Sequence, residues 1–214
     1  FDGGHYFNPE PIGPHGWAEV WRWMRTRNPG PWPAPADETC AAAPASLPAT
    51  DTVRLTWVGH ATMLIQTAGL NVLTDPIWSA RASPAPFAGP RRVHPPALCL
   101  DTLPPIHAVL ISHNHYDHLD IPTLRRLHAA HTPVVYAPPG HARLLARVGI
   151  DRVHELDWWQ HAELASGVRL TAVPARHWSA RGAFDRNHAL WAGFHLQGPA
   201  VSVYFAGDTG YGTH

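Results

Sequence analysis

The chain has 214 residues, with 16 Lys and Arg against 16 Asp and Glu, so its formal net charge is +0 when histidine is neutral. A domain of this length can bury a sizeable core without cross-links. The balanced charge argues against a general nucleic-acid binder, which needs a basic excess to contact phosphates. The only cysteines, Cys40 and Cys99, suggest neither a disulfide framework nor a cysteine-based zinc site. The 17 histidines are a weak indication of metal, because neutral imidazole is the commonest metal ligand.

Residues 1–50 are rich in proline and tryptophan and are predicted to form an N-terminal arm before the main domain, residues 51–214. Trp17, Trp21 and Met24 recur at helical spacing, which predicts a short amphipathic helix over residues 15–27.

Arg22 and Arg25 lie beside the apolar face of this helix, a composition that suits contact with a lipid surface. Packing of the same face on the protein itself is the alternative. No apolar run approaches the ~20 residues of a membrane-spanning helix. We therefore expect a cytoplasmic or peripheral membrane protein.

From residue 53 the pattern changes to short apolar runs mixed with two helical segments, which predicts one domain of the α/β (α+β) class. Residues 76–105 are rich in proline, and a loop of that length is usually functional or disordered. The predicted strands cover residues 53–59, 61–67, 70–75, 106–112, 134–139, 168–175, 189–197 and 200–208, and the predicted helices cover residues 120–131 and 140–149.

The segment SHNHYDHLD, residues 112–120, places four side chains that can hold a metal within six residues: His113, His115, Asp117 and His118. It follows a near-continuous apolar run that is typical of a buried strand. Four ligands exceed the three that one catalytic ion usually takes, which favours two adjacent ions. A solvated polar loop is the alternative.

Two further candidate ligands, His177 in PARHWS and Asp208 in FAGDTGY, follow other predicted strands. Strand ends in a layered fold cluster along one edge, so we expect these side chains to lie near the motif.

The motif resembles the His-x-His-x-Asp-His signature of the metallo-β-lactamase superfamily. The segments WVGHATMLIQ, LTDPIWSARASP, PARHWSARGAFDRN and YFAGDTGYG resemble its N-acyl phosphatidylethanolamine phospholipase D branch. The resemblance implies an αββα sandwich, incomplete at the C-terminus, with two zinc ions at its edge. It assigns His113, His115 and His177 to the first zinc and Asp117 and His118 to the second, with Asp208 as the bridge between them.

The same resemblance places one last histidine ligand of the second zinc beyond residue 214. We therefore expect the second ion to bind more weakly than the first, and this chain to show little phosphodiesterase activity. We also expect the incomplete sheets to expose apolar surface, which favours association with another chain as a homo-oligomer.

The function that the resemblance implies is zinc-dependent phosphodiester hydrolysis of phospholipase D type. A metal-bound hydroxide would attack the phosphorus of a phospholipid such as N-acyl phosphatidylethanolamine. Asp117 would orient this hydroxide as well as ligate, which makes it the candidate catalytic residue. Two alternatives stay open: another hydrolase of the same fold, such as a lactonase, and a non-catalytic metal-binding fragment.

Three more residues are candidates for contact with the metal ligands or the substrate. Asp75 ends an apolar strand and can accept the second N–H of a ligating histidine, or simply cap a turn. His60 is expected near the site. Tyr116 lies between ligands and either faces the substrate or packs outward. Arg91 and Arg92 can meet a phosphate, but solvated surface arginines are the favoured interpretation.

Overall fold

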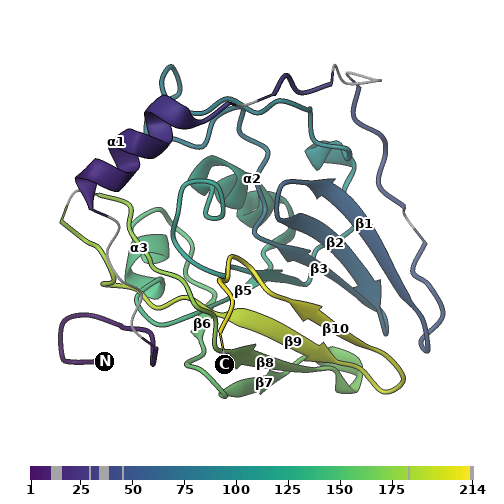
Figure 1. Ribbon diagram of the computed structural model, residues 1–214. Helices are drawn as coiled ribbons and strands as arrows, with labels where there is room; N and C mark the ends of the chain where they lie inside the picture. The colour runs from purple at the N-terminus through teal and green to yellow at the C-terminus, as the bar shows by residue number, and fades with distance from the viewer. Residues whose placement is uncertain (11–15, 29, 34–38, 45, 183, 213–214) are drawn as a thin grey trace.

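Two β-sheets form the body of the protein (Figure 1). The computed structural model describes residues 1–10, 16–28, 30–33, 39–44, 46–182 and 184–212. The first sheet has the order β1-β2-β3-β4-β5-β6 and becomes parallel from β3 onward. The second has the order β10-β9-β8-β7 and is antiparallel throughout. The strands are β1 (Val53–Gly59), β2 (Thr62–Thr67), β3 (Leu70–Thr74), β4 (Ala108–Leu110), β5 (Val134–Ala137), β6 (Val153–Glu155), β7 (His161–Glu163), β8 (Arg169–Val173), β9 (Gly193–Gln197) and β10 (Ser202–Phe205).

The central strands of the first sheet separate two apolar layers, because successive side chains of a strand point to opposite faces. Leu73 of β3 belongs to a cluster that includes Leu124 of helix α2 (Ile121–His131). Its neighbour Val72 belongs to a second cluster, which includes Phe194 of β9 in the other sheet. Burial on both faces explains why these strands read as near-continuous apolar runs.

The layers follow from these two clusters. Helix α2 and helix α3 (Ala142–Ala146) pack on the outer side of the first sheet, α3 through Leu145. The second sheet packs on the inner side, and its outward side chains include Tyr204, which is 55% exposed. The predicted α/β sandwich is therefore confirmed, with helix, sheet and sheet as the layers of the described residues (Figure 1).

Some predicted elements differ in extent from the observed ones. The strand expected over residues 189–197 begins only at Gly193, because residues 189–192 form a buried irregular segment. The helix expected over residues 140–149 is reduced to α3. The sequence patterns miss β6 and β7, which have three residues each and little apolar periodicity.

Asp120 precedes α2, in the position where an aspartate often caps a helix, but its carboxylate has another role. Its carboxylate accepts hydrogen bonds from the backbone N–H groups of Trp78 (3.2 Å) and Ser79 (2.9 Å) and from Oγ1 of Thr123 (2.6 Å). It makes no side-chain capping bond to the helix. The start of the proline-rich loop, residues 76–105, is thereby fastened to the body of the protein.

The N-terminal arm contains helix α1 (Trp17–Thr26), which confirms the helix predicted over residues 15–27. The side chain of Trp17 lies outside the described residues. Trp21, Trp23 and Met24 are 61%, 59% and 46% exposed, so these side chains do not pack into a core. Within the described ranges, no helix has the length and apolar character needed to cross a bilayer. The division of the chain at residue 50 stays a prediction.

Cys40 and Cys99 form a disulfide, which the number of cysteines in the sequence did not suggest. Next to the disulfide, Ala41 pairs with Leu98, and the backbone N–H of Cys99 donates to the carbonyl of Ala41 (2.9 Å). Sequence patterns could not show this pairing, because the cysteines lie 59 residues apart in segments without regular periodicity. The disulfide joins the arm to the proline-rich loop.

We predict that reducing this disulfide destabilises the protein by up to about 4 kcal/mol, because a cross-link between residues separated by 59 positions restricts the unfolded chain. Denaturant unfolding with and without reductant measures the effect. A Cys40→Ser/Cys99→Ser variant should have the same free energy of unfolding as the reduced wild type, and reductant should not change it. Equal stability of the oxidised and reduced wild type would contradict the prediction.

Candidate metal centre

Strand ends bring the candidate ligands to one edge of the sandwich. Because β3 and β4 are parallel, Asp75 after β3 and the motif of residues 112–120 after β4 emerge side by side. Strands β8 and β10 both run antiparallel to β9, so His177 and Asp208, which follow them, also emerge at a common edge. Side chains that are distant in sequence therefore meet at one place.

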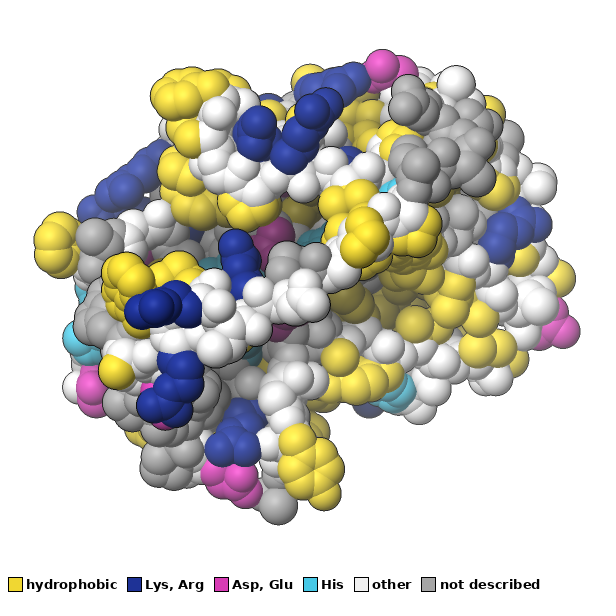
Figure 2. Space-filling model, turned by 45° about the horizontal axis from the view of Figure 1, so that its top comes forward, with side chains coloured by type: hydrophobic (Ala, Val, Ile, Leu, Met, Phe, Trp, Pro, Cys, Tyr) yellow, Lys and Arg dark blue, Asp and Glu magenta, His cyan; other side chains and the backbone are white. Residues whose placement is uncertain are grey.

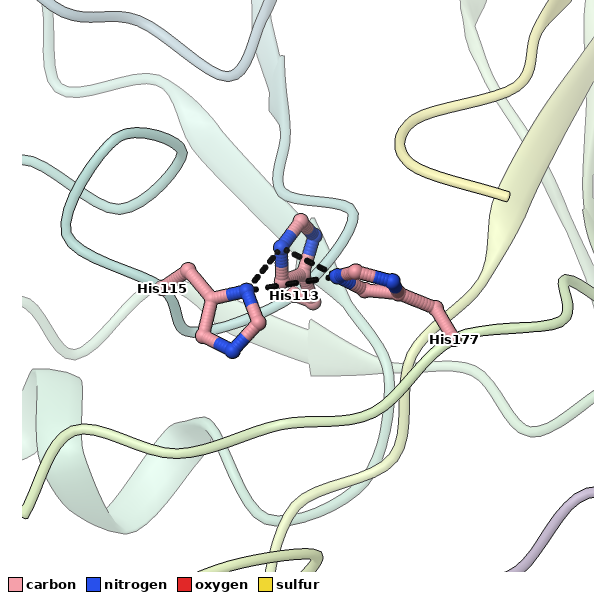
Figure 3. Close-up of side chains that lie close together, drawn as sticks. All are labelled: His113, His115 and His177. Carbon is pink, nitrogen blue, oxygen red and sulfur yellow. Dashed lines mark hydrogen bonds between the residues drawn. The ribbon is translucent and has the colours of Figure 1, made fainter. Parts of the chain in front are cut away.

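Three histidine nitrogens converge on one point (Figure 3). Nε2 of His113 lies 2.8 Å from Nδ1 of His115, and Nε2 of His177 lies 3.2 Å from each of these two atoms. Three ring nitrogens in mutual contact cannot all be satisfied by hydrogen bonds, since each N–H points at one acceptor. A tetrahedral ion with bonds of about 2.0–2.1 Å separates its ligand atoms by roughly 3.3–3.4 Å. The two separations from His177 are close to this value, and the 2.8 Å between His113 and His115 is shorter.

The protonation of these histidines also suits a metal. Burial, together with the neighbouring imidazoles, lowers the pKa of His113 far below its ordinary range. Burial lowers the pKa of His177 to about 4, with a further contribution from His115. Burial likewise lowers the pKa of His115. Neutral imidazoles offer lone pairs, so the triangle is ready to act as three nitrogen ligands at neutral pH.

A second group lies beside the triangle and centres on His118. Nε2 of His118 is buried and has no hydrogen-bond partner in the part of the chain that the structure describes. It lies 3.3 Å from Oδ1 of Asp208 and 3.8 Å from Oδ2 of Asp117. The other oxygen of Asp208 lies 3.7 Å from Nε2 of His177. Asp208 therefore spans the two groups, as a carboxylate that bridges two ions would.

Asp75 fixes the orientation of His118. Its buried carboxylate accepts hydrogen bonds from the backbone N–H of Ser112 (2.7 Å), from Oγ of Ser112 (2.5 Å) and from Nδ1 of His118 (2.7 Å). With Nδ1 donating to Asp75, Nε2 is the nitrogen that faces the cluster.

The electrostatics of this second group favour a cation. Burial by itself would lower the pKa of His118, but Asp208 and Asp75 raise it to about 10. In the absence of metal, His118 is therefore a cation among carboxylates. A metal ion would replace this proton and meet the same negative groups.

Of the two remaining candidate residues, His60 lies in the cluster and Tyr116 lies outside it. Nε2 of His60 lies 3.2 Å from Oδ2 of Asp117, so His60 belongs to the second group. Tyr116 does not join the cluster: its hydroxyl donates to the carbonyl of Arg181 (3.0 Å), whose guanidinium lies 4.0 Å from the centre of the tyrosine ring. Tyr116 therefore packs against Arg181, and its role toward a substrate stays a prediction.

Arg92 is not the solvated surface arginine that we expected. Its Nη2 donates to the carbonyl of Ile77 (2.8 Å), and burial lowers the pKa of its guanidinium. This bond holds the proline-rich loop in place. Arg91 remains exposed.

A pocket of about 510 Å³ reaches the cluster at His60 and Asp117. Hydrophobic side chains gather around the recessed part of this face in Figure 2. The walls of the pocket combine apolar side chains with the two arginines of the proline-rich loop: Trp32, Trp57, Val58, Ile77, Val93, Arg91 and Arg92.

One residue that contacts the site, Asn8, belongs to no motif or periodic pattern in the sequence that would predict its role. The side-chain amide of Asn8 bonds both backbone groups of His177: Oδ1 accepts from its N–H (3.1 Å), and Nδ2 donates to its carbonyl (2.8 Å). The two residues are 169 positions apart. The arm therefore holds a member of the histidine triangle in place.

We predict that Asn8→Ala lowers the free energy of unfolding by about 1–3 kcal/mol, because it leaves a backbone N–H and a carbonyl at His177 unpaired. Thermal and urea unfolding measure the loss. His5→Ala is the matched control in the same segment, since the His5 side chain is exposed and contacts the imidazole of His188 (3.1 Å) and the carboxylate of Asp2 (4.0 Å) but not His177. Equal effects of the two substitutions would contradict the role of Asn8.

Comparison with known proteins gives three related findings. A family model described as "Beta-lactamase superfamily domain" matches residues 70–214. An uncharacterized protein of Mycobacterium tuberculosis is 45% identical over 159 residues, which are 73% of this chain and 42% of that protein. The N-acyl-phosphatidylethanolamine-hydrolyzing phospholipase D 1 of Caenorhabditis elegans is 37% identical over 165 residues, 73% of this chain and 46% of that protein. The chain thus spans less than half the length of these relatives.

The fold is also similar to that of a solved structure. Igni18, a metallo hydrolase from Ignicoccus hospitalis, superposes with a TM-score of 0.57 at 21% identity, covering 75% of this chain and 63% of its own. This likeness supports the architecture described above.

Proposed function

Because the chain belongs to the beta-lactamase superfamily, we propose that it carries the metal centre of a hydrolase that cleaves lipid phosphodiesters of the N-acyl phosphatidylethanolamine type. The observation that carries the proposal is the apolar pocket that ends at His60 and Asp117 of the cluster. A pocket with apolar walls and polar groups at one end suits a lipid with a polar headgroup. The name of the worm relative supports the same substrate class.

We propose zinc as the metal, in two positions. His113, His115 and His177 would hold the first ion, Asp117 and His118 the second, and Asp208 would bridge them. Nitrogen-rich and carboxylate ligand sets of this kind suit zinc. When bound, the ions supply Lewis acidity and lower the pKa of water, so that hydrolysis needs no nucleophilic side chain.

Asp117 is the candidate catalytic residue. Burial by itself would raise the pKa of this carboxyl, but the adjacent His60 and the charge of His118 lower it to about 2. It is therefore ionised at neutral pH, and it lies where the pocket meets the cluster. A carboxylate in this position can accept a hydrogen bond from the attacking water and orient it toward a bound substrate.

The arm offers a way to reach lipid substrates. Exposed Trp21, Trp23 and Met24 on α1 occur together with Arg22 and Arg25, which are also exposed. Aromatic and basic side chains on one short helix favour binding at a membrane surface. We propose peripheral contact of α1 with membranes that contain the substrate.

A substrate panel tests the proposed function. Any hydrolysis by the zinc-loaded protein should act on N-acyl phosphatidylethanolamine in mixed micelles and leave lactones and β-lactams intact, even if the rate is as low as the sequence leads us to expect. His113→Ala/His115→Ala should lose both bound zinc and activity. Hydrolysis of a lactone alone would favour the lactonase alternative. Zinc binding without any hydrolysis would favour the non-catalytic alternative.

The pocket makes a sharper prediction for one substitution. Trp32→Ser removes an apolar wall residue that is 70% exposed, so the fold should tolerate it. We expect the KM for the lipid to rise roughly tenfold, since about 1.4 kcal/mol of apolar contact is lost. The rate for a small soluble phosphodiester should stay the same. Trp159→Ser is the control, because Trp159 is 68% exposed and lies outside this pocket. Equal lipid KM values in both variants would contradict this use of the pocket.

A further inference from the structure

The turn between β1 and β2 displays His60 in an unusual backbone conformation. His60 has φ 51°, in the left-handed region that non-glycine residues adopt only at some cost. The register of β1 with β2 shifts between Trp57 and Gly59, just before the turn. Nε1 of Trp57 donates to the carbonyl of His60 (2.9 Å) and fixes this geometry. The fold therefore maintains a strained turn whose side chain is a histidine.

The imidazole of His60 reaches the second group of the metal cluster. Its Nε2 lies 3.2 Å from Oδ2 of Asp117, and its ring lies 5.0 Å from the ring of His118, centre to centre. One ligand atom each of His60, Asp117 and His118 lie within 4.8 Å of one another. The nitrogen–oxygen separation is close to the roughly 3.3–3.4 Å between two ligand atoms of one tetrahedral zinc.

We infer that His60 is a protein ligand of the second ion in this chain, beside Asp117, His118 and Asp208. The inference rests on the proposed function and deepens it. It gives the second position two imidazoles and two carboxylates, which is the number of ligands that zinc usually takes. It also revises the expectation that the second ion is held weakly for want of a histidine.

The position of His60 has a consequence for substrate access. His60 is half-exposed and lines the apolar pocket together with Asp117. A ligand at this place stands between the pocket and the more deeply buried His118. A lipid that enters the pocket would thus meet the second ion position first, on the side where His60 lies.

The alternative role for His60 is that of an outer-sphere partner, which donates a hydrogen bond to Asp117 and does not touch the metal. The two roles predict different losses of zinc affinity when His60 is replaced. Loss of an outer-sphere partner typically weakens metal binding by roughly 10–100-fold. Loss of a ligand should weaken the second site by more than about 100-fold, since it removes a bond to the ion itself.

Calorimetric titration of the metal-free protein with zinc chloride tests the inference. The wild type should bind two ions. His60→Ala and His60→Gln should keep the first site unchanged and lose more than about 100-fold in affinity at the second. Glutamine is informative because its amide can still donate to Asp117 but ligates zinc poorly. His94→Ala is the matched control, since His94 lines the same pocket but lies outside the cluster.

X-ray absorption at the zinc edge gives a second readout that does not depend on affinity. The mean number of imidazole ligands per zinc in the fully loaded protein should fall in His60→Gln and stay constant in His94→Ala. Two tight sites in His60→Gln, or an unchanged imidazole count, would overturn the inference and leave the proposed function standing. Failure of the wild type to bind zinc would overturn both.

Discussion

The candidate metal centre depends on the hydrogen bonds of one buried carboxylate, that of Asp75. An isolated charge at this depth would be costly, and three hydrogen bonds from Ser112 and His118 offset the cost. Those bonds tie the end of β3 to the start of the motif after β4. They also hold His118 with Nε2 toward the cluster. A single residue thereby couples the register of the first sheet to the orientation of a candidate ligand.

The second sheet supplies the other half of the centre. His177 and Asp208 follow strands that run in the same direction, and the apolar layer between the sheets sets their distance from the motif. Asn8 adds a contact from the arm to the backbone of His177. The centre is thus assembled from both sheets and the arm, and its geometry depends on the packing of all three.

The sequence could predict those parts of the site that are local. The ligand motif is a contiguous segment after a buried strand, and Asp75, His177 and Asp208 each follow an apolar run, so their common edge could be inferred. Contacts between irregular segments could not be inferred in this way. The disulfide between Cys40 and Cys99 is one such contact, and the pair of hydrogen bonds from Asn8 to the backbone of His177 is another. No periodicity or motif marks either of them.

Asp120 illustrates a different limit. Its place before α2 predicts a cap, yet tertiary contacts with Trp78 and Ser79 take its carboxylate instead. The position of Asp120 in the sequence indicates that its carboxylate accepts hydrogen bonds, but it does not indicate which groups donate them. The loop that Asp120 fastens leads to the wall of the apolar pocket, so this difference bears on the proposed binding of lipid.

We propose that the two groups of side chains form one binuclear metal centre. Diffraction from crystals of the zinc-loaded protein, with anomalous data collected on both sides of the zinc absorption edge, tests it most directly. We predict two anomalous peaks about 3.5–4 Å apart, one among His113, His115 and His177 and the other beside His118, with Asp208 between them. A single peak, or peaks away from these residues, would contradict it.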